Sequence, residues 1–190
     1  DINLICSNGL ASVEQLKILK NGGISKYNHN LESSREFYPN ICTTHSWDER
    51  VQTNLNAKEA GLKLCVGGIF GLGESVDDRI SMLKEIAKLD PYCVPLNFFH
   101  PNSALPIVKN QINIENAFEM IQIARDILGK KPRLMVAGGR ELMFKEREYE
   151  VFEYGANALV VGDYLTTTGK NGAREVEELE KLGYKISPTG

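Results

Sequence analysis

The chain has 190 residues, 42% of them hydrophobic and 25% charged, and its 22 Lys and Arg against 25 Asp and Glu give a formal net charge of −3. This composition is typical of a folded globular protein and excludes a disordered tail, a collagen-like fibre and a disulfide-rich mini-protein. The acidic balance also argues against nucleic acid or an anionic membrane as the main partner, and no stretch approaches the roughly 20 apolar residues of a membrane helix.

The cysteines lie far apart, at positions 6, 42, 65 and 93. Their spacing fits neither a disulfide framework nor a Cys-x-x-Cys zinc site, so we expect reduced thiols and a cytoplasmic location. The chain begins with Asp1, inside a pattern that already indicates a strand. We therefore expect that the upstream part of a longer protein is missing.

Six β-rich runs alternate with helical patterns from one end of the chain to the other. The predicted strands are residues 2–6, 25–29, 63–69, 93–99, 133–137 and 158–162. These runs are apolar on both faces, as expected for parallel strands that are covered by helices. The sequence therefore predicts an α/β fold built from a parallel sheet.

The helices between these strands have recognisable starts, because a polar capping residue precedes each helical pattern. The predicted capping residues are Ser12, Ser46, Ser75 and Asn113. Two further helices are predicted over residues 141–154 and 173–182. Six βα units in one domain, residues 1–190, fit either an open doubly wound sheet or part of an eight-unit barrel. A complete barrel needs about 250 residues, so the chain is short by about two units.

In both architectures ligands bind at the C-terminal ends of the strands. Cys6, Cys65 and Arg133 lie on the first, third and fifth predicted strands. Alternate strands of a barrel contribute side chains to the same interior layer, so two thiols and a guanidinium could converge on one point. In the alternative interpretation the cysteines are small buried apolar residues and Arg133 pairs with a carboxylate.

Several other strand ends carry polar groups. Residues 28–32, Asn-His-Asn-Leu-Glu, offer amides for a urea-like ligand and a carboxylate for ribose hydroxyls, and Asn97 ends a neighbouring strand. Residues 67–74 are rich in glycine, so the backbone can approach a planar ligand closely while Ile69 offers an apolar face. Residues 166–168 are threonines, whose hydroxyls suit a small anion. Each segment could instead be an ordinary turn or loop.

Six segments together carry a family resemblance. They read YNHNLES at 27–33, FYPNICTT at 37–44, GGIFGLGES at 67–75, VPLN at 94–97, RLMVAGGRE at 133–141 and GANA at 155–158. In this order, across nearly the whole chain, they resemble the biotin synthase family of radical S-adenosylmethionine enzymes. The resemblance implies a (β/α)8 barrel of TIM type, of which this chain holds about six βα units, strands three to eight.

The resemblance also implies an activity, the radical insertion of sulfur into dethiobiotin to form biotin. In the family a [4Fe–4S] cluster reduces S-adenosylmethionine to methionine and a 5′-deoxyadenosyl radical, and a [2Fe–2S] cluster supplies the sulfur. It further implies an electron-donating flavoprotein such as flavodoxin, or a ferredoxin, as partner, and a homodimer.

Family roles carry over to individual residues where the motifs match. The resemblance implies that Cys6, Cys65 and Arg133 are ligands of the [2Fe–2S] cluster, with Cys65, Arg133 and Asn30 as catalytic residues. Implied cofactor-binding residues are Asn30, Glu32, Arg50 and Ile69, and implied dethiobiotin-binding residues are Asn30, Asn97, Thr167 and Thr168. Glu32 stands where the family often has Asp.

Two family features are absent from residues 1–190: the Cys-x-x-x-Cys-x-x-Cys run that binds the [4Fe–4S] cluster, and a third cysteine ligand of the [2Fe–2S] cluster. We expect both upstream of Asp1, and we expect this chain alone not to cleave S-adenosylmethionine. The alternatives are another radical S-adenosylmethionine enzyme that inserts sulfur, and a truncated fragment that only binds substrate. A phosphate-binding barrel aldolase or isomerase is disfavoured, because no strand end carries a catalytic Lys.

Overall fold

The computed structural model describes residues 3–101, 112–162 and 170–187. Contacts within the chain define two compact units, Asp1–Ala158 and Leu159–Gly190. The first unit holds nearly all of the sheet, and the described residues of the second include one helix, α6 (Gly172–Lys181). The single domain that the sequence predicts over residues 1–190 stays a prediction.

The sheet contains all six predicted strands. The strands are β1 (Leu4–Cys6), β2 (Ile24–Asn28), β3 (Lys63–Cys65), β4 (Gly68–Phe70), β5 (Cys93–Phe98), β6 (Arg133–Val136) and β7 (Ala158–Leu159). Their order is β1-β2-β3-β5-β6-β7, with β4 also paired to β5, and every pairing from β1 to β6 is parallel. The prediction of a parallel α/β sheet is confirmed.

The third predicted strand is divided into β3 and β4, and the cause lies at Gly67. A Cβ atom on Gly67 would lie 1.8 Å from the carbonyl oxygen of Pro95, so the two backbones touch where only glycine fits. The Gly67 carbonyl accepts from the N–H of Leu31 at 2.9 Å, two residues along from the bond between the His29 N–H and the Cys65 carbonyl. The segment that follows β2 therefore stays hydrogen-bonded to the chain across the break between β3 and β4.

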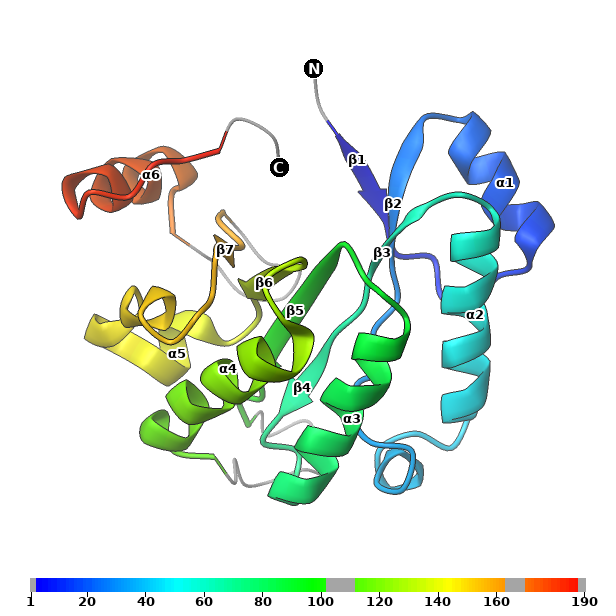
Figure 1. Ribbon diagram of the computed structural model, residues 1–190, viewed down its shortest axis with the longest axis horizontal. Helices are drawn as coiled ribbons and strands as arrows, with labels where there is room; N and C mark the ends of the chain where they lie inside the picture. The colour runs from blue at the N-terminus through cyan, green and yellow to red at the C-terminus, as the bar shows by residue number, and fades with distance from the viewer. Residues whose placement is uncertain (1–2, 102–111, 163–169, 188–190) are drawn as a thin grey trace. The chain divides into compact units, whose positions relative to one another are not determined.

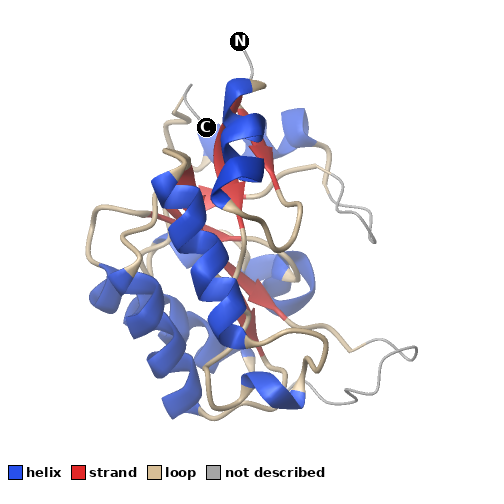
Figure 2. Cartoon of the chain, turned by 90° about the vertical axis from the view of Figure 1, so that its right-hand side faces the viewer, coloured by secondary structure: helices blue, strands red, loops and turns tan. Residues whose placement is uncertain are grey.

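The helices of the first unit lie along one side of the sheet (Figures 1 and 2). They are α1 (Val13–Asn21), α2 (Trp47–Glu59), α3 (Val76–Lys88), α4 (Ile114–Leu128) and α5 (Arg140–Phe144), with the 3₁₀ turns η1 (Tyr38–Asn40), η2 (Lys145–Arg147) and η3 (Glu150–Phe152). Ser12, Ser46 and Ser75 form complete capping boxes, and Asn113 caps α4. These predicted helix starts are confirmed.

One predicted helix is wrong in its extent. Residues 141–154 form the short α5 followed by two 3₁₀ turns. Arg140, fully buried, binds Glu148 at 2.7 Å. In a continuous helix residue 148 would lie about 12 Å further along the axis, because each residue adds 1.5 Å. The chain leaves the helix at Lys145, where φ is +51°, and so returns Glu148 to the buried guanidinium.

The register divides the strand side chains between two faces. Tyr27, Leu64, Val94 and Leu134 share one face, and all are at most 3% exposed. The other face carries a row in which Asn28, Cys65, Cys93 and Arg133 are register partners across β2, β3, β5 and β6. The apolar core therefore fills the first face, and chemically reactive groups lie on the second.

Candidate functional site

The first part of the site lies where β2 ends and β4 begins, between Asn30 and Gly68. The side-chain oxygen of Asn30 accepts from the N–H of Gly67 at 3.0 Å, and the carbonyl of Glu32 accepts from the N–H of Ile69 at 2.9 Å. Glu32 and Gly68 form an isolated parallel bridge. The backbone thus fixes Asn30, Glu32 and Ile69 along one edge, as the strand-end argument predicts.

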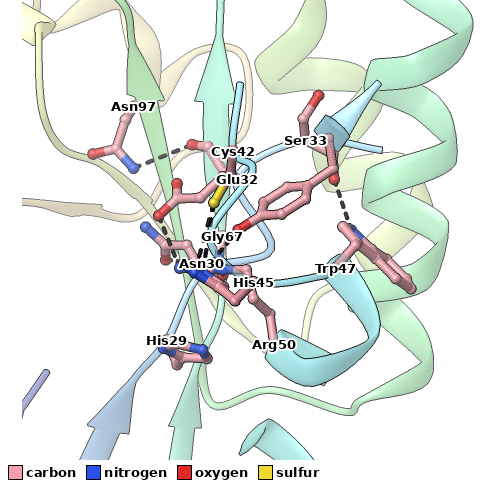
Figure 3. A network of polar contacts seen from close by, with 12 residues as sticks. His29, Asn30, Glu32, Ser33, Cys42, His45, Trp47, Arg50, Gly67 and Asn97 are labelled. Atoms are coloured by element: carbon pink, nitrogen blue, oxygen red, sulfur yellow. Dashed lines mark hydrogen bonds and ion pairs between the residues drawn. The ribbon is translucent and has the colours of Figure 1, made fainter. Parts of the chain in front are cut away.

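Arg50, from the first turn of α2, joins this edge. Its Nε donates to the Asn30 carbonyl at 2.6 Å, its Nη2 pairs with Glu32 Oε1 at 3.2 Å, and its Nη1 lies 2.9 Å from His45 Nε2. Figure 3 shows these side chains gathered around the guanidinium. The structure therefore brings together three residues that the sequence predicts to bind the cofactor, Asn30, Glu32 and Arg50.

Glu32 holds an unused hydrogen-bond acceptor. Its Oε2 is buried and has no hydrogen-bond partner, whereas buried polar atoms are normally paired. Burial raises the pKa of the Glu32 carboxyl, and the charge of Arg50 and the hydrogen bond from Asn30 oppose that rise. A ligand that donates a hydrogen bond would satisfy this oxygen.

Two more unpaired atoms precede Glu32, the buried Asn28 Oδ1 and His29 Nε2. Burial, reinforced by the positive charges of Arg50 and His45, lowers the pKa of His29 to about 4. His29 is therefore neutral at pH 7. Sequence reasoning left His29 without a role, and only its burial distinguishes it from a turn residue.

Asn97 connects the start of β4 to the turn after β6. Its Nδ2 donates to the Gly68 carbonyl at 3.1 Å, and its Oδ1 accepts from the N–H of Gly138 at 2.9 Å. Ile69 is its register partner on β4 and is half-exposed. Asn97 and Ile69 thus lie at the same strand-end edge, and Asn97 holds two backbone segments in place there.

The carboxylate of Glu74 stabilises the glycine-rich turn after β4 by accepting hydrogen bonds from the backbone of that turn. Glu74 accepts from the N–H groups of Gly71 and Leu72 at 2.7 and 2.6 Å, and its Oε1 pairs with Arg79 at 2.6 Å. Both charged side chains are at most 5% exposed. This part of the predicted ligand cradle is a tight turn, because Glu74 occupies the amides that a ligand would need.

The second part of the site is the row of register partners on the open face, which is the face of the sheet opposite the apolar core. The row consists of Asn28, Cys65, Cys93 and Arg133. Cys65 and Cys93 are 5% and 3% exposed. Interaction with Cys93, together with burial, raises the pKa of the Cys65 thiol, and interaction with Cys65 lowers the pKa of the Cys93 thiol. Arg133, register partner of Cys93, has its guanidinium carbon 5.0 Å from the ring centre of Tyr92. Cys65 and Arg133 thus share one row, with Cys93 between them.

The structure does not bring Cys6 into this row. Cys6 is in register with Tyr27 and so shares its face, because the ladder shifts between Leu4 and Ile5. A one-residue shift moves a side chain to the other face of a sheet. Among the residues that the structure describes, no group of three or more His, Cys, Asp or Glu side chains could hold a metal ion. The ligand set of Cys6, Cys65 and Arg133 stays a prediction.

The remaining predicted residues, Thr167 and Thr168, lie outside the described residues. Sequence reasoning gave no role to Cys93, which lies between Cys65 and Arg133 in the row of register partners. Within the described ranges no helix combines the length and the apolar character needed to cross a membrane.

Comparison with known proteins identifies the family to which the chain belongs. A model of the radical SAM superfamily matches residues 1–86, and one of the biotin and thiamin synthesis associated domain matches residues 95–185. The biotin synthase of Campylobacter fetus is 53% identical over 189 residues, which cover 98% of this chain and 68% of that protein. The chain belongs to the biotin synthase family. The biotin synthase of Aliarcobacter butzleri is 61% identical over 98% of this chain and 66% of its own length, so the chain spans about two thirds of such relatives.

Solved structures confirm the fold expected of a biotin synthase. Methylornithine synthase (PylB) superposes with a TM-score of 0.81 at 20% identity, over 98% of this chain and 59% of that one. The hydrogenase maturase HydG of Carboxydothermus hydrogenoformans gives 0.80 at 17% identity, over 96% and 47%. At such identities the likeness concerns the fold alone. It supports the predicted part-barrel fold.

Proposed function

We propose that this chain is part of an enzyme that inserts sulfur into dethiobiotin to form biotin by radical S-adenosylmethionine chemistry. One observation carries the proposal: Asn30, Glu32 and Arg50, the residues expected to hold the cofactor in this family, meet at one strand-end edge around an unpaired buried carboxylate oxygen. Family membership supplies the reaction, and this arrangement supports a cofactor site in this chain.

The residues present fit S-adenosylmethionine by their chemistry. Glu32 Oε2 would accept from a ribose hydroxyl, and Arg50 would pair with the carboxylate of the methionyl part through a charge-assisted hydrogen bond. Ile69 would pack on the adenine. When bound together with a [4Fe–4S] cluster, this cofactor supplies the radical that removes hydrogen from an alkyl carbon.

Dethiobiotin would lie beside the same edge. The amides of Asn30 and Asn97 each retain donor or acceptor capacity beyond the bonds described above, and an amide matches a ureido ring in both roles. Thr167 and Thr168 would bind the carboxylate tail. Enclosure by both ligands would keep water from the radical.

The row on the open face fits an iron–sulfur cluster. Cys65 is a buried thiol on a rigid strand, and cationic side chains of Lys26, Lys63 and Arg133 stand around the neighbouring Tyr92 ring. Cationic surroundings favour an anionic thiolate cluster, which in this family supplies the sulfur atom. Cys6 would join the ligand set only if β1 adopts the unshifted register.

The proposal extends to partners and location. An electron-donating flavodoxin-type flavoprotein or a ferredoxin would reduce the [4Fe–4S] cluster, and the protein would act as a homodimer in the cytoplasm. Residues 1–190 lack the family's [4Fe–4S] cysteine run, so we expect the isolated chain not to cleave S-adenosylmethionine. Activity is therefore tested on the intact protein.

The test uses Glu32→Gln in the intact protein after anaerobic reconstitution of its clusters. The wild type is expected to form biotin from dethiobiotin, S-adenosylmethionine and a reductant. Glu32→Gln keeps the shape but removes the charge, and losing a charge-assisted hydrogen bond of about 1.5–3 kcal/mol weakens cofactor binding roughly tenfold or more. Equilibrium dialysis with labelled cofactor measures that affinity.

Glu36→Gln is the matched control, since Glu36 lies four residues away and is exposed. Its affinity should equal that of the wild type. Absence of biotin from a wild-type protein that holds both clusters contradicts the proposed reaction. Equal affinity in Glu32→Gln and the wild type contradicts the cofactor site.

A further inference from the structure

His45 lies directly before helix α2, and its position relative to Arg50 follows from how that helix begins. Ser46 is the N-cap and forms a capping box with Glu49. His45 is therefore the residue before the cap and Arg50 is the fourth residue of the helix, the two positions that contact each other in a hydrophobic staple. Here the contact is polar, because Arg50 Nη1 lies 2.9 Å from His45 Nε2 (Figure 3). The start of α2 thus places an imidazole against the candidate cofactor-binding arginine.

The direction of this hydrogen bond follows from the chemistry of its two ends. A guanidinium donates and does not accept, so His45 Nε2 is the acceptor. In the neutral ring the proton is then on Nδ1, which lies 3.1 Å from the hydroxyl oxygen of Thr44. The Tyr38 hydroxyl lies 2.9 Å from Nε2, and burial raises the pKa of Tyr38 to about 12, so this hydroxyl keeps its proton and also donates. His45 is thereby held as an acceptor toward Arg50.

Three contacts orient the planar guanidinium of Arg50. Its Nε donates to the Asn30 carbonyl, its Nη2 pairs with Glu32, and its Nη1 donates to His45. A guanidinium has five N–H groups, so donor capacity remains on both terminal nitrogens. A carboxylate binds best to two parallel N–H groups of a guanidinium, and the orientation of that plane therefore decides how well a carboxylate is bound. His45 is the contact that holds Nη1.

We propose that His45 is a positioning residue, which holds the Arg50 guanidinium in the orientation that meets the carboxylate of the cofactor. His45 thereby sets the preference of the site for a ligand that carries this carboxylate. The inference rests on the proposed function, which pairs Arg50 with the methionyl carboxylate. A contact that only stabilised the start of α2 would contribute equally to the binding of ligands with and without a carboxylate.

The experiment therefore compares two ligands that differ only in this group, S-adenosylmethionine and decarboxylated S-adenosylmethionine. Equilibrium dialysis against the intact protein, with its clusters reconstituted and no reductant present, gives the dissociation constant of each ligand. The ratio of the two constants measures the preference for the carboxylate. The proteins are the wild type, His45→Ala, His45→Gln, His45→Asn, Arg50→Gln and the double variant of His45→Ala with Arg50→Gln. Thr43→Ala, at an exposed position of the same loop, is the matched control, and circular dichroism establishes that each protein is folded.

We expect His45→Ala to reduce this preference about fivefold, the usual effect of one hydrogen bond, and to leave the affinity for the decarboxylated ligand unchanged. His45→Gln should restore the preference, because its side chain brings an amide oxygen to the position of Nε2. His45→Asn should resemble His45→Ala, because its shorter amide reaches only the position of Nδ1. Adding His45→Ala to Arg50→Gln should change the preference no further, since His45 acts through Arg50. Thr43→Ala should equal the wild type.

The inference and the proposed function fail in different ways. An unchanged preference in His45→Ala, or an equal loss of affinity for both ligands, overturns the role of His45. If His45→Ala does not fold, His45→Gln and His45→Asn decide, and equal preferences in these two variants overturn the role as well. A reduced preference in Arg50→Gln alone leaves the proposed cofactor site in place without His45. If Arg50→Gln keeps the wild-type preference, the proposed pairing of Arg50 with the carboxylate is wrong and the inference falls with it.

Discussion

At the scale of single residues, the most constrained position is Gly67. It must be glycine because the Pro95 carbonyl occupies the space of a Cβ atom, and its N–H and C=O bind Asn30 and Leu31. These contacts fix the geometry of the candidate cofactor site without a side chain at Gly67. A change at this residue therefore acts on both stability and ligand binding.

Gly67→Ala is expected to destabilise the protein by about 1–3 kcal/mol, the usual cost of overpacking, since the clash is with backbone that cannot rotate away. Urea unfolding followed by circular dichroism measures the change. Gly172→Ala is the control, because its added Cβ would meet nothing closer than 3.6 Å and would start helix α6. A neutral effect of Gly67→Ala would show that the Pro95 backbone on β5 gives way easily.

Residue patterns predicted the cofactor edge better than the cluster row. Asn30 and Glu32 follow β2 and Asn97 lies near the end of β5, and parallel strands bring their C-terminal ends together whatever the detailed register. Cys6 and Cys65 depend on register, and a shift of one residue between Leu4 and Ile5 reverses the face of Cys6. Strand patterns contain no signal for such a shift.

At the scale of elements, the sequence predicted the starts of helices more reliably than their ends. Serine capping boxes mark the starts of α1, α2 and α3, because the cap satisfies amides of the first turn locally. The end of α5 depends instead on the pairing of Arg140 with Glu148, a contact that helical periodicity does not encode. The capping boxes could be predicted from neighbouring residues in the sequence, whereas the tertiary contact between Arg140 and Glu148 could not.

Removal of Glu148 tests this account of α5. Glu148→Ala is expected to cost about 3–5 kcal/mol, because it takes a carboxylate from a fully buried guanidinium. Glu150→Ala removes a carboxylate from the partly exposed Arg147 and should cost at most about 1 kcal/mol. Urea unfolding compares the two variants. Equal costs would mean that the pairing with Glu148 contributes little to the stability of buried Arg140.

At the scale of the whole molecule, stability is expected to fall in mild acid. His29 is neutral in the folded protein because burial lowers its pKa to about 4, whereas in the unfolded chain it titrates near 6.5. The unfolded state therefore binds a proton first, and the stabilisation present above pH 6.5 is lost as pH falls toward 4.

Urea midpoints at pH 7.5, 6.0 and 5.0 should decline for the wild type. His29→Gln, which cannot take up the proton, should show a shallower decline over the same interval. Parallel pH profiles for the two proteins would assign the acid sensitivity to other groups.

The two family regions, residues 1–86 and 95–185, are joined within one sheet. Strand β4 belongs to the first region, and its ladder partner β5 belongs to the second. Asn97 ties the Gly68 carbonyl to the Gly138 amide across the same boundary. Cutting the polypeptide between residues 86 and 95 would leave an unpaired strand edge on each piece. We therefore expect that the protein cannot be divided into two stable parts at the boundary between the two family regions.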